Sequence, residues 1–214
     1  NAAFYKMALA VAIPIMIQNG ITNFVSLLDN IMVGRVGTEQ MTGVAIVNQL
    51  IFVFNLAIFG AVSGAGIFGA QFFGRGDYNG VRHTLRFNIL LCAGFTVIAT
   101  VLLALIPDTL IGAFLHEAGT GGDLALTLSE GEDYLRIMLF GLPAFCLTTA
   151  YVSILRVTGD NRLPMKASIA AIFVNLVFNY LLIYGKLGFP MLGVRGAAIA
   201  TVLSRYVEFG LILL

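Results

Sequence analysis

Residues 44–73 read VAIVNQLIFVFNLAIFGAVSGAGIFGAQFF and contain no charged side chain. A helix needs about 20 mainly apolar residues to cross a hydrocarbon core of roughly 30 Å. The run therefore predicts a membrane-spanning helix. Because it is longer than one crossing requires, we expect this helix to tilt or to extend beyond the bilayer.

The rest of the chain has the same character. Of its 214 residues, 59% are hydrophobic and 11% are charged, and its mean hydropathy is +0.95. An average soluble domain carries about 25% charged residues. The composition therefore predicts an all-α integral membrane protein in contact with membrane lipid. A net charge of +1, without a basic cluster among aromatic residues, argues against nucleic acid as a partner.

Apolar runs bounded by charged residues, glycine or proline predict six transmembrane helices. They lie near residues 7–33, 44–73, 87–106, 134–155, 166–184 and 194–214. Pro143 falls inside the fourth and permits a kink, because proline removes a backbone hydrogen bond. Small residues in the stretch GAVSGAG, residues 60–66, predict close packing of two helices. The acidic, glycine-rich segment 107–133 is expected to be an exposed loop.

The short loops differ in their lysine and arginine content, and this difference predicts the orientation. One side collects Lys6, Arg75, Arg82, Arg86, Arg156, Arg162 and Lys166, and the other has Arg35, Lys186 and Arg195. The first side is expected to be cytoplasmic, so both ends of the chain would face the cytoplasm. The first residue is not methionine and the last run is apolar, so we expect a fragment or one half of a longer protein.

Two of the cytoplasmic loops resemble each other. FGRGDYNGVRHTLRFNIL, from residue 73, and RVTGDNRLPMKASIAAIF, from residue 156, both place Gly-Asp between a basic residue and a new apolar helix. Such an echo is typical of a transporter built from repeated helical units. Chance similarity between two basic loops explains it equally well.

Catalytic and cofactor motifs are not supported. GAGIFG, residues 64–69, matches a dinucleotide fingerprint, but no strand precedes it and no acidic residue follows at the required distance. His83 and His116 fall in opposite loops, and no HExxH, phosphate-binding or GxSxG motif occurs. Cys92 and Cys146 are expected to be packing residues. We therefore predict a protein that is not an enzyme and has no cofactor.

The first predicted span carries polar residues on one helical face. Gln18, Thr22, Ser26 and Asp29 recur at spacings of four, four and three residues, and Asn23 lies beside them. Each unsatisfied polar group costs several kcal/mol in hydrocarbon, so this face must line a cavity or pair with another helix. A carboxylate inside a membrane span indicates a functional site, because its burial is costly.

The fifth and sixth spans offer matching polar groups. Asn175 and Asn179 lie one helical turn apart, and Thr201 lies in the last span. Their oxygens could hold a protonated or ionised Asp29, or complete the shell of a small cation such as Na⁺. Such residues also form ordinary interhelical hydrogen bonds. Arg205 and Glu208 are expected to pair with each other.

Four segments in order resemble the multidrug and toxic compound extrusion (MATE) family. They are AIPIMIQNGITNFVSLLDNIMVG, GAQFFGRGD, LRVTGDNRLPM and NLVFNYLLIYGKLGFPMLGVRGAAIAT. The resemblance covers the whole chain and implies residues 1–214 form the amino-terminal six-helix lobe of a twelve-helix, two-lobe transporter. It implies a secondary active antiporter of the bacterial or archaeal inner membrane that exports cationic or amphipathic small molecules in exchange for H⁺ or Na⁺.

The resemblance also implies a coupling-ion site at Asp29 with Asn175, Asn179, Ala197 and Thr201 around it. Some relatives carry a second aspartate where this chain has Asn179, so the preferred ion stays open. Two other functions remain: a flippase for lipid-linked oligosaccharides of the same superfamily, which would need more cationic residues in the cavity, or a helical membrane scaffold that pairs with a second copy of itself.

Overall fold

The computed structural model describes residues 2–118 and 123–214, and these ranges form helices and no strand. The helices are α1 (Ala2–Gly34), α2 (Thr38–Gly74), α3 (Tyr78–Leu105), α4 (Pro107–Ala118), α5 (Leu124–Leu139), α6 (Leu142–Val157), α7 (Arg162–Tyr184) and α8 (Gly193–Leu213). The predicted all-α fold is confirmed.

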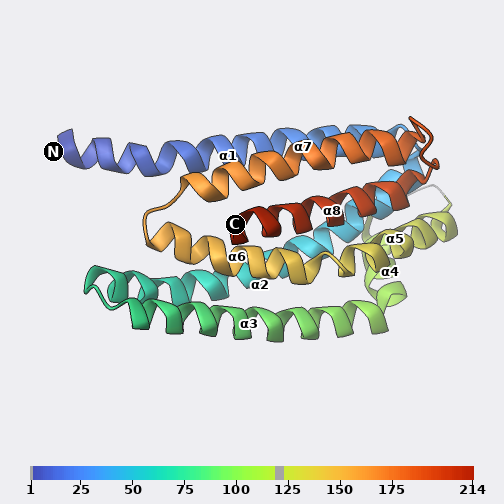
Figure 1. The fold of residues 1–214 in the computed structure, drawn as a ribbon. Helices are drawn as coiled ribbons and strands as arrows, with labels where there is room; N and C mark the ends of the chain where they lie inside the picture. Colours follow the sequence, from blue (N-terminus) through green and yellow to red (C-terminus); the bar gives the residue numbers. More distant parts are fainter. Residues whose placement is uncertain (1, 119–122) are drawn as a thin grey trace.

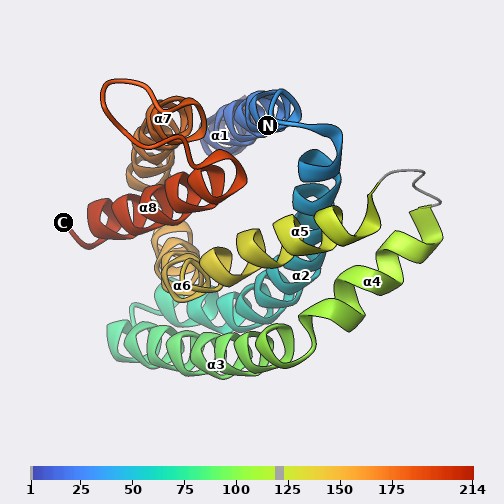
Figure 2. The same cartoon turned by 90° about the vertical axis from the view of Figure 1, so that its right-hand side faces the viewer.

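The helices form an elongated bundle in which the long elements run back and forth (Figure 1). Helices α1 and α7 lie side by side and run parallel, because Gln18 of α1 donates to Ser168 of α7 and Asn179 of α7 donates to Asp29 of α1, and each pair is 150 residues apart. Helices α2 and α3 form an antiparallel hairpin at the opposite side, and α8 runs between these layers. Figure 2 shows the same helices from one end, with α5 next to α2.

Four helices in the described ranges, α2, α3, α7 and α8, are long and apolar enough to cross a membrane, and the bent pair of α5 and α6 makes a fifth span if it counts as one. Helix α1, the remaining predicted span, is a continuous helix of 33 residues. Many of its side chains before Ile15 lie outside the described part of the structure.

Helices α2 and α3 begin well before the apolar runs that predicted them. Helix α2 begins at Thr38 rather than near residue 44, and α3 begins at Tyr78 rather than near residue 87. Polar residues can continue a helix beyond its apolar part, and hydropathy detects only the part that is apolar. Asp77 marks the true beginning of α3, because its side chain accepts a hydrogen bond from the Gly80 amide at 2.9 Å.

The segment 107–133, expected to be an exposed loop, is exposed or half-buried at most of its described residues, but it is mostly helical. Helix α4 and the first half of α5 occupy most of it, and residues 119–122 lie outside the described ranges. Acidic residues indicate that a segment is exposed, but they do not exclude a helix. The Asp123 carboxylate accepts from the amides of Ala125 and Leu126, and α5 begins there.

The predicted fourth span, residues 134–155, is not one straight helix. It comprises the end of α5 and most of α6, which bend by 48° at a break between Leu139 and Leu142. Pro143 lies in the first turn of α6, where its missing N–H removes no helical hydrogen bond. The proline therefore begins a new helix at the bend.

The two loops of similar sequence form the same turn. Gly76 and Gly159 both have positive φ, at 71° and 88°, and each donates to the carbonyl three residues back. The following aspartates, Asp77 and Asp160, donate their own amides to the carbonyl five residues back. This pattern ends one helix with a glycine, and the aspartate side chain then begins the next. The sequence echo therefore has a structural basis.

We expect Asp77→Ala to lower the free energy of unfolding by about 1 kcal/mol, because the Gly80 amide loses its side-chain acceptor. Thermal unfolding in detergent, followed by circular dichroism, measures the effect. Asp77→Asn is the control, since asparagine also caps helices well. Equal stability of the alanine variant and the parent would show that this cap contributes nothing.

Close packing occurs at other glycines than those predicted. A Cβ atom at Gly60 or Gly64 would meet nothing within 4 Å. A Cβ atom at Gly43 would lie 2.7 Å from the Thr127 carbonyl oxygen, and one at Gly196 would lie 2.7 Å from the backbone of Leu182. Helix pairs α2–α5 and α7–α8 therefore depend on glycine, whereas the GAVSGAG stretch does so only weakly through Gly66 near Ser153.

The apolar core lies where α2, α5 and α6 meet. Val47, Ile58, Leu135, Met138 and Leu142 are each at most 1% exposed. Cys146, on α6, donates its thiol to the Cys92 carbonyl of α3 at 3.1 Å, and both cysteines are buried. This core fixes the positions of α5 and α6 against α2.

Candidate functional site

A cavity of about 320 Å³ lies between α1, α2, α5, α7 and α8. Asp29 lines it, so we call it the Asp29 cavity. Its other polar lining residues are Ser26, Asn30, Asn48, Tyr134, Asn179, Thr201 and Arg205. Five segments that are far apart in the sequence therefore contribute polar atoms to one space.

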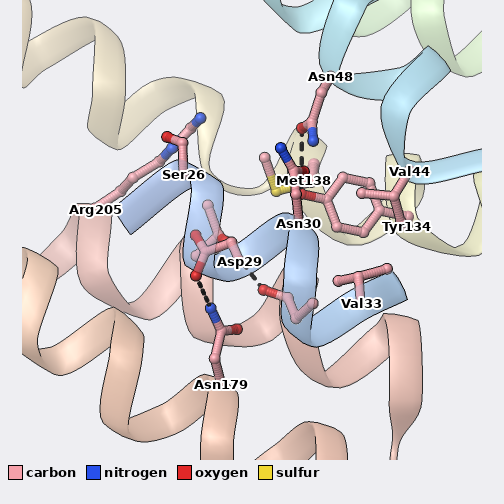
Figure 3. A pocket seen from close by; sticks show the side chains of 12 residues that line it. Ser26, Asp29, Asn30, Val33, Val44, Asn48, Tyr134, Met138, Asn179 and Arg205 are labelled. Atoms are coloured by element: carbon pink, nitrogen blue, oxygen red, sulfur yellow. Dashed lines mark hydrogen bonds between the residues drawn. The ribbon is translucent and has the colours of Figure 1, made fainter. Parts of the chain in front are cut away.

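Asp29 is half-buried and meets the amide groups of α7. The Asn179 Nδ2 atom donates to the Asp29 carboxylate at 2.6 Å, and Figure 3 shows these two side chains pointing toward each other. Asn179 is 1% exposed. The short hydrogen bond from this buried amide to the carboxylate attaches α1 to α7.

Asn175 lies one turn earlier on α7 and faces both carboxylate oxygens of Asp29. One end of its amide lies 3.1 Å from Oδ2 and 3.2 Å from Oδ1. With nitrogen at that end, Asn175 donates to Asp29, and its oxygen accepts from the Thr201 hydroxyl at 3.3 Å. This orientation suits an ionised carboxylate, because it adds a donor.

The opposite orientation of the Asn175 amide creates a different site. The oxygen then accepts from Asn179 Nδ2 at 3.1 Å, and the nitrogen donates to Thr201 at 3.3 Å. An amide oxygen now lies beside two carboxylate oxygens, and such a cluster of acceptors is repulsive unless a proton or a cation lies among them. The orientation of the Asn175 amide therefore decides whether this end of it donates to Asp29 or accepts from Asn179.

The oxygen atoms around Asp29 fit a hard cation. Carboxylate, amide and hydroxyl oxygens are the ligands that such cations prefer. The Asn179 Oδ1 atom is buried and has no hydrogen-bond partner among the described residues. The carbonyl oxygen of Ala197 accepts from the Thr201 hydroxyl at 3.0 Å, so Ala197 orients Thr201 as well as lining the cavity.

The predicted cavity-lining residues of α1 separate into three groups. Ser26 lines the Asp29 cavity, whereas Gln18 lines a second cavity of about 620 Å³, closer to the start of α7. Asn23 is exposed and lines neither of these two cavities. The side chain of Thr22 lies outside the described residues. One polar face of α1 thus lines two cavities, because Gln18 and Ser26 lie about two helical turns apart along it.

Sequence analysis missed two polar residues of the site, Asn48 and Tyr134. Asn48 accepts from the Tyr134 hydroxyl at 3.3 Å on the side of the cavity away from Asn179 (Figure 3). Asn48 could have been found, because it is a polar residue within an apolar run. Tyr134 lies at the end of a predicted span, where a tyrosine does not indicate a site.

The predicted pairing of Arg205 with Glu208 is wrong. The Arg205 guanidinium lies over the Phe145 ring, 5.2 Å from its centroid, and lines the Asp29 cavity. Glu208 accepts instead from the Ser168 hydroxyl and lines the second cavity. The ion pairs in the described ranges are Arg136–Glu132 and Arg195–Asp133. Helical spacing alone could not reveal that the two side chains enter different cavities.

Comparison with curated proteins finds multidrug resistance proteins. The chain is 32% identical over 97% of its length to the probable multidrug resistance protein NorM of Thermotoga maritima, of which it covers 43%. It is 28% identical over 92% of its length to the probable multidrug resistance protein YoeA of Bacillus subtilis, of which it covers 41%. The chain thus spans about two fifths of the length of these relatives.

Comparison with solved structures also finds transporters. An outward-facing multidrug resistance MATE family transporter of the MOP superfamily matches 97% of the chain with a TM-score of 0.83 and 26% identity, over 44% of that transporter. A MOP superfamily transporter from Pyrococcus furiosus, described as having a binding pocket of reverse polarity and a different function, matches 97% of the chain with a TM-score of 0.78 and 26% identity, over 43% of that transporter.

The MatE family profile matches residues 14–181, most of the chain. The match includes α1 from Pro14 onward and the two asparagines of α7, so it covers the segments that meet at Asp29. The chain belongs to the MatE family of multidrug and toxic compound extrusion transporters and fits their amino-terminal lobe.

Proposed function

We propose that this lobe is part of a secondary active antiporter that exports cationic or amphipathic compounds in exchange for H⁺ or Na⁺, with the coupling ion bound at Asp29. The observation that carries the proposal is the Asp29 carboxylate in a cavity, in contact with Asn179 and facing Asn175. The multidrug resistance proteins among its relatives support the export of drugs.

The site offers two ways to bind the coupling ion. A proton would bind Asp29 directly, and the Asn175 amide would then present its oxygen to the carboxyl group. Sodium would instead be held by oxygen atoms of Asp29, Asn175, Asn179 and Thr201. Either ion neutralises the negative charge of the Asp29 carboxylate. That charge favours the orientation in which Asn175 donates to Asp29, so both ions favour the opposite orientation of the Asn175 amide.

Transport requires that the ion and the exported compound favour different conformations, since a ligand shifts an equilibrium only by its differential affinity. Helix α1 is the element that an ion would move, because α7 holds it through polar groups of Asn179 and Ser168. Ion binding at Asp29 changes one of these attachments. We infer that α1 then rearranges and alters the shape of the cavity, which promotes release outside.

The proposal extends to the partner of this lobe and to its membrane. Transport rather than catalysis is proposed, with no cofactor besides the coupling ion. The partner is the carboxy-terminal lobe of the same protein or a second copy of this one, in a cell inner membrane with both ends of the chain cytoplasmic. One guanidinium, of Arg205, lines the Asp29 cavity beside a carboxylate, and this mixed charge suits a pyrophosphate of a lipid-linked sugar poorly.

The test is flux through the full-length protein in proteoliposomes. A fluorescent organic cation is loaded, and a proton gradient or a sodium gradient is imposed separately. We expect one gradient to accelerate flux and the other to leave it unchanged, which would identify the coupling ion. Equal flux with either gradient and with none would contradict antiport. Transfer of a lipid-linked oligosaccharide in the same vesicles would support the flippase instead.

A further inference from the structure

The second cavity contains a carboxylate that the proposed coupling site does not use. Glu208 of α8 lines this cavity of about 620 Å³, which we call the Glu208 cavity. Its walls are mainly apolar and include Phe59 and Ile67 of α2 and Phe145 of α6. A carboxylate in such surroundings needs specific partners, because burial of a charge without them is costly.

Those partners form a chain of side chains across four helices. Arg156 of α6 donates its Nη2 to the Gln18 Oε1 atom at 3.5 Å, and Gln18 of α1 donates its Nε2 to Ser168 Oγ at 2.6 Å. The Ser168 hydroxyl of α7 then donates to a Glu208 carboxylate oxygen of α8. Every donor points toward Glu208, so the chain leads from a cation to an anion.

Among the side chains that the structure describes, the charged groups near Glu208 are both arginines. Arg205 lies one turn earlier on α8 and extends over Phe145, and its Nη1 atom has no hydrogen-bond partner in the described ranges. Arg156 reaches Glu208 only through Gln18 and Ser168. Helices α1 and α7 contribute these two neutral side chains. The acidic residues of α5 lie near Arg195, roughly 20 Å away along α8.

We propose that Glu208 is a second proton-binding site of this lobe, separate from Asp29, and that Gln18 of α1 senses its charge through Ser168. The ligand is a proton that enters through the Glu208 cavity. When Glu208 binds it, the carboxyl group gains a donor and the serine no longer faces an anion. The Arg156–Gln18–Ser168 chain then loses the negative charge toward which its donors point.

The consequence concerns α1. Asp29 and Gln18 are two points at which side-chain hydrogen bonds attach α1 to α7, besides the Tyr184 hydroxyl that donates to the Met32 carbonyl, and they lie three helical turns apart. Each attachment therefore depends on its own carboxylate. Loss of charge at Glu208 loosens the half of α1 nearest the start of α7, whereas an ion at Asp29 changes the other half.

Infrared difference spectroscopy of the full-length protein, between mildly acidic and mildly alkaline pH, tests the proton site. The comparison uses an Asp29→Asn background, so that the proposed coupling site is silent. We expect a carbonyl band of a protonated carboxyl group that Glu208→Gln removes. Glu132→Gln is the matched control, since that glutamate pairs with exposed Arg136, and it should leave the band intact. Superimposable spectra with and without Glu208 would overturn the proposal.

Ser168→Ala provides a second variant that keeps the carboxylate. It removes the hydroxyl that donates to Glu208, so the carbonyl band should shift in frequency. An unchanged band would overturn the assignment even if Glu208→Gln failed to fold. The infrared test does not depend on gradient-driven flux, which the Asp29→Asn background is expected to lose. Failure of the second proton site is therefore distinguishable from failure of the coupling site.

The response of α1 needs a separate measurement. Spin labels at Ile17→Cys and Phe173→Cys would report the distance between α1 and α7, because both side chains are exposed and the native Cys92 and Cys146 are buried. In the Asp29→Asn background we expect this distance to lengthen on acidification, and Glu208→Gln should abolish the change with pH. A change that persists in Glu208→Gln would overturn the role of Gln18 as the sensor.

Discussion

Asp29→Asn should reduce gradient-driven flux by roughly 10- to 150-fold, because a hydrogen bond to a charged group contributes about 1.5–3 kcal/mol and the amide cannot bind a proton. Asparagine has nearly the same size, so the cavity keeps its shape. It cannot supply the negative charge that attracts Na⁺ either. The variant should therefore lose coupling to either ion.

The measurement compares flux of a fluorescent organic cation in proteoliposomes with equilibrium binding of the same compound in detergent. We expect binding to persist in Asp29→Asn while flux falls. Asp133→Asn is the matched control, since Asp133 is a carboxylate in an exposed ion pair with Arg195, at 2.6 Å. It should retain flux, because exposed ion pairs contribute little. Undiminished flux in Asp29→Asn would make Asp29 a structural residue.

Gly196→Ala should destabilise the lobe by about 1–3 kcal/mol, the usual cost of overpacking. The new Cβ atom would lie 2.7 Å from the carbonyl carbon and oxygen of Leu182 and 3.0 Å from its Cβ atom. Backbone atoms cannot rotate away as a flexible side chain can. Helices α7 and α8 would therefore have to separate, although Asn175, Asn179 and Thr201 depend on their close approach.

Thermal unfolding in detergent measures this effect, with Gly64→Ala as the matched control. A Cβ atom at Gly64 meets nothing within 4 Å, and alanine favours a helix over glycine by roughly 0.5–1 kcal/mol. The two substitutions should thus change the melting temperature in opposite directions. If Gly196→Ala melted no lower than the parent, the contact between α7 and α8 would be loose enough to accept a methyl group.

The local pattern of the sequence determined the helical class and several of the site residues. Asp29, Asn175, Asn179 and Thr201 were recognisable because a polar group in an apolar run needs a partner, whatever the fold. Their contacts follow that expectation. The sequence echo at Gly76 and Gly159 also described a turn, because positive φ restricts the choice of residue.

Helix boundaries followed less well from hydropathy, since an apolar run ends where exposure begins rather than where hydrogen bonding ends. Helix α4 and the first half of α5 lie in an acidic, glycine-rich segment for this reason. The bend between α5 and α6 likewise left no break in hydropathy.

Only the tertiary structure decided which partners the polar residues meet. Arg205 and Glu208 are neighbours on one helix, yet one lies over Phe145 and the other accepts from Ser168, because helices α6 and α7 occupy different sides of α8. Gln18 and Asp29 lie on one stripe but line two cavities. The sequence by itself determined that these groups must be satisfied; the arrangement of helices far apart along the chain determined how, because packing of side chains sets those distances.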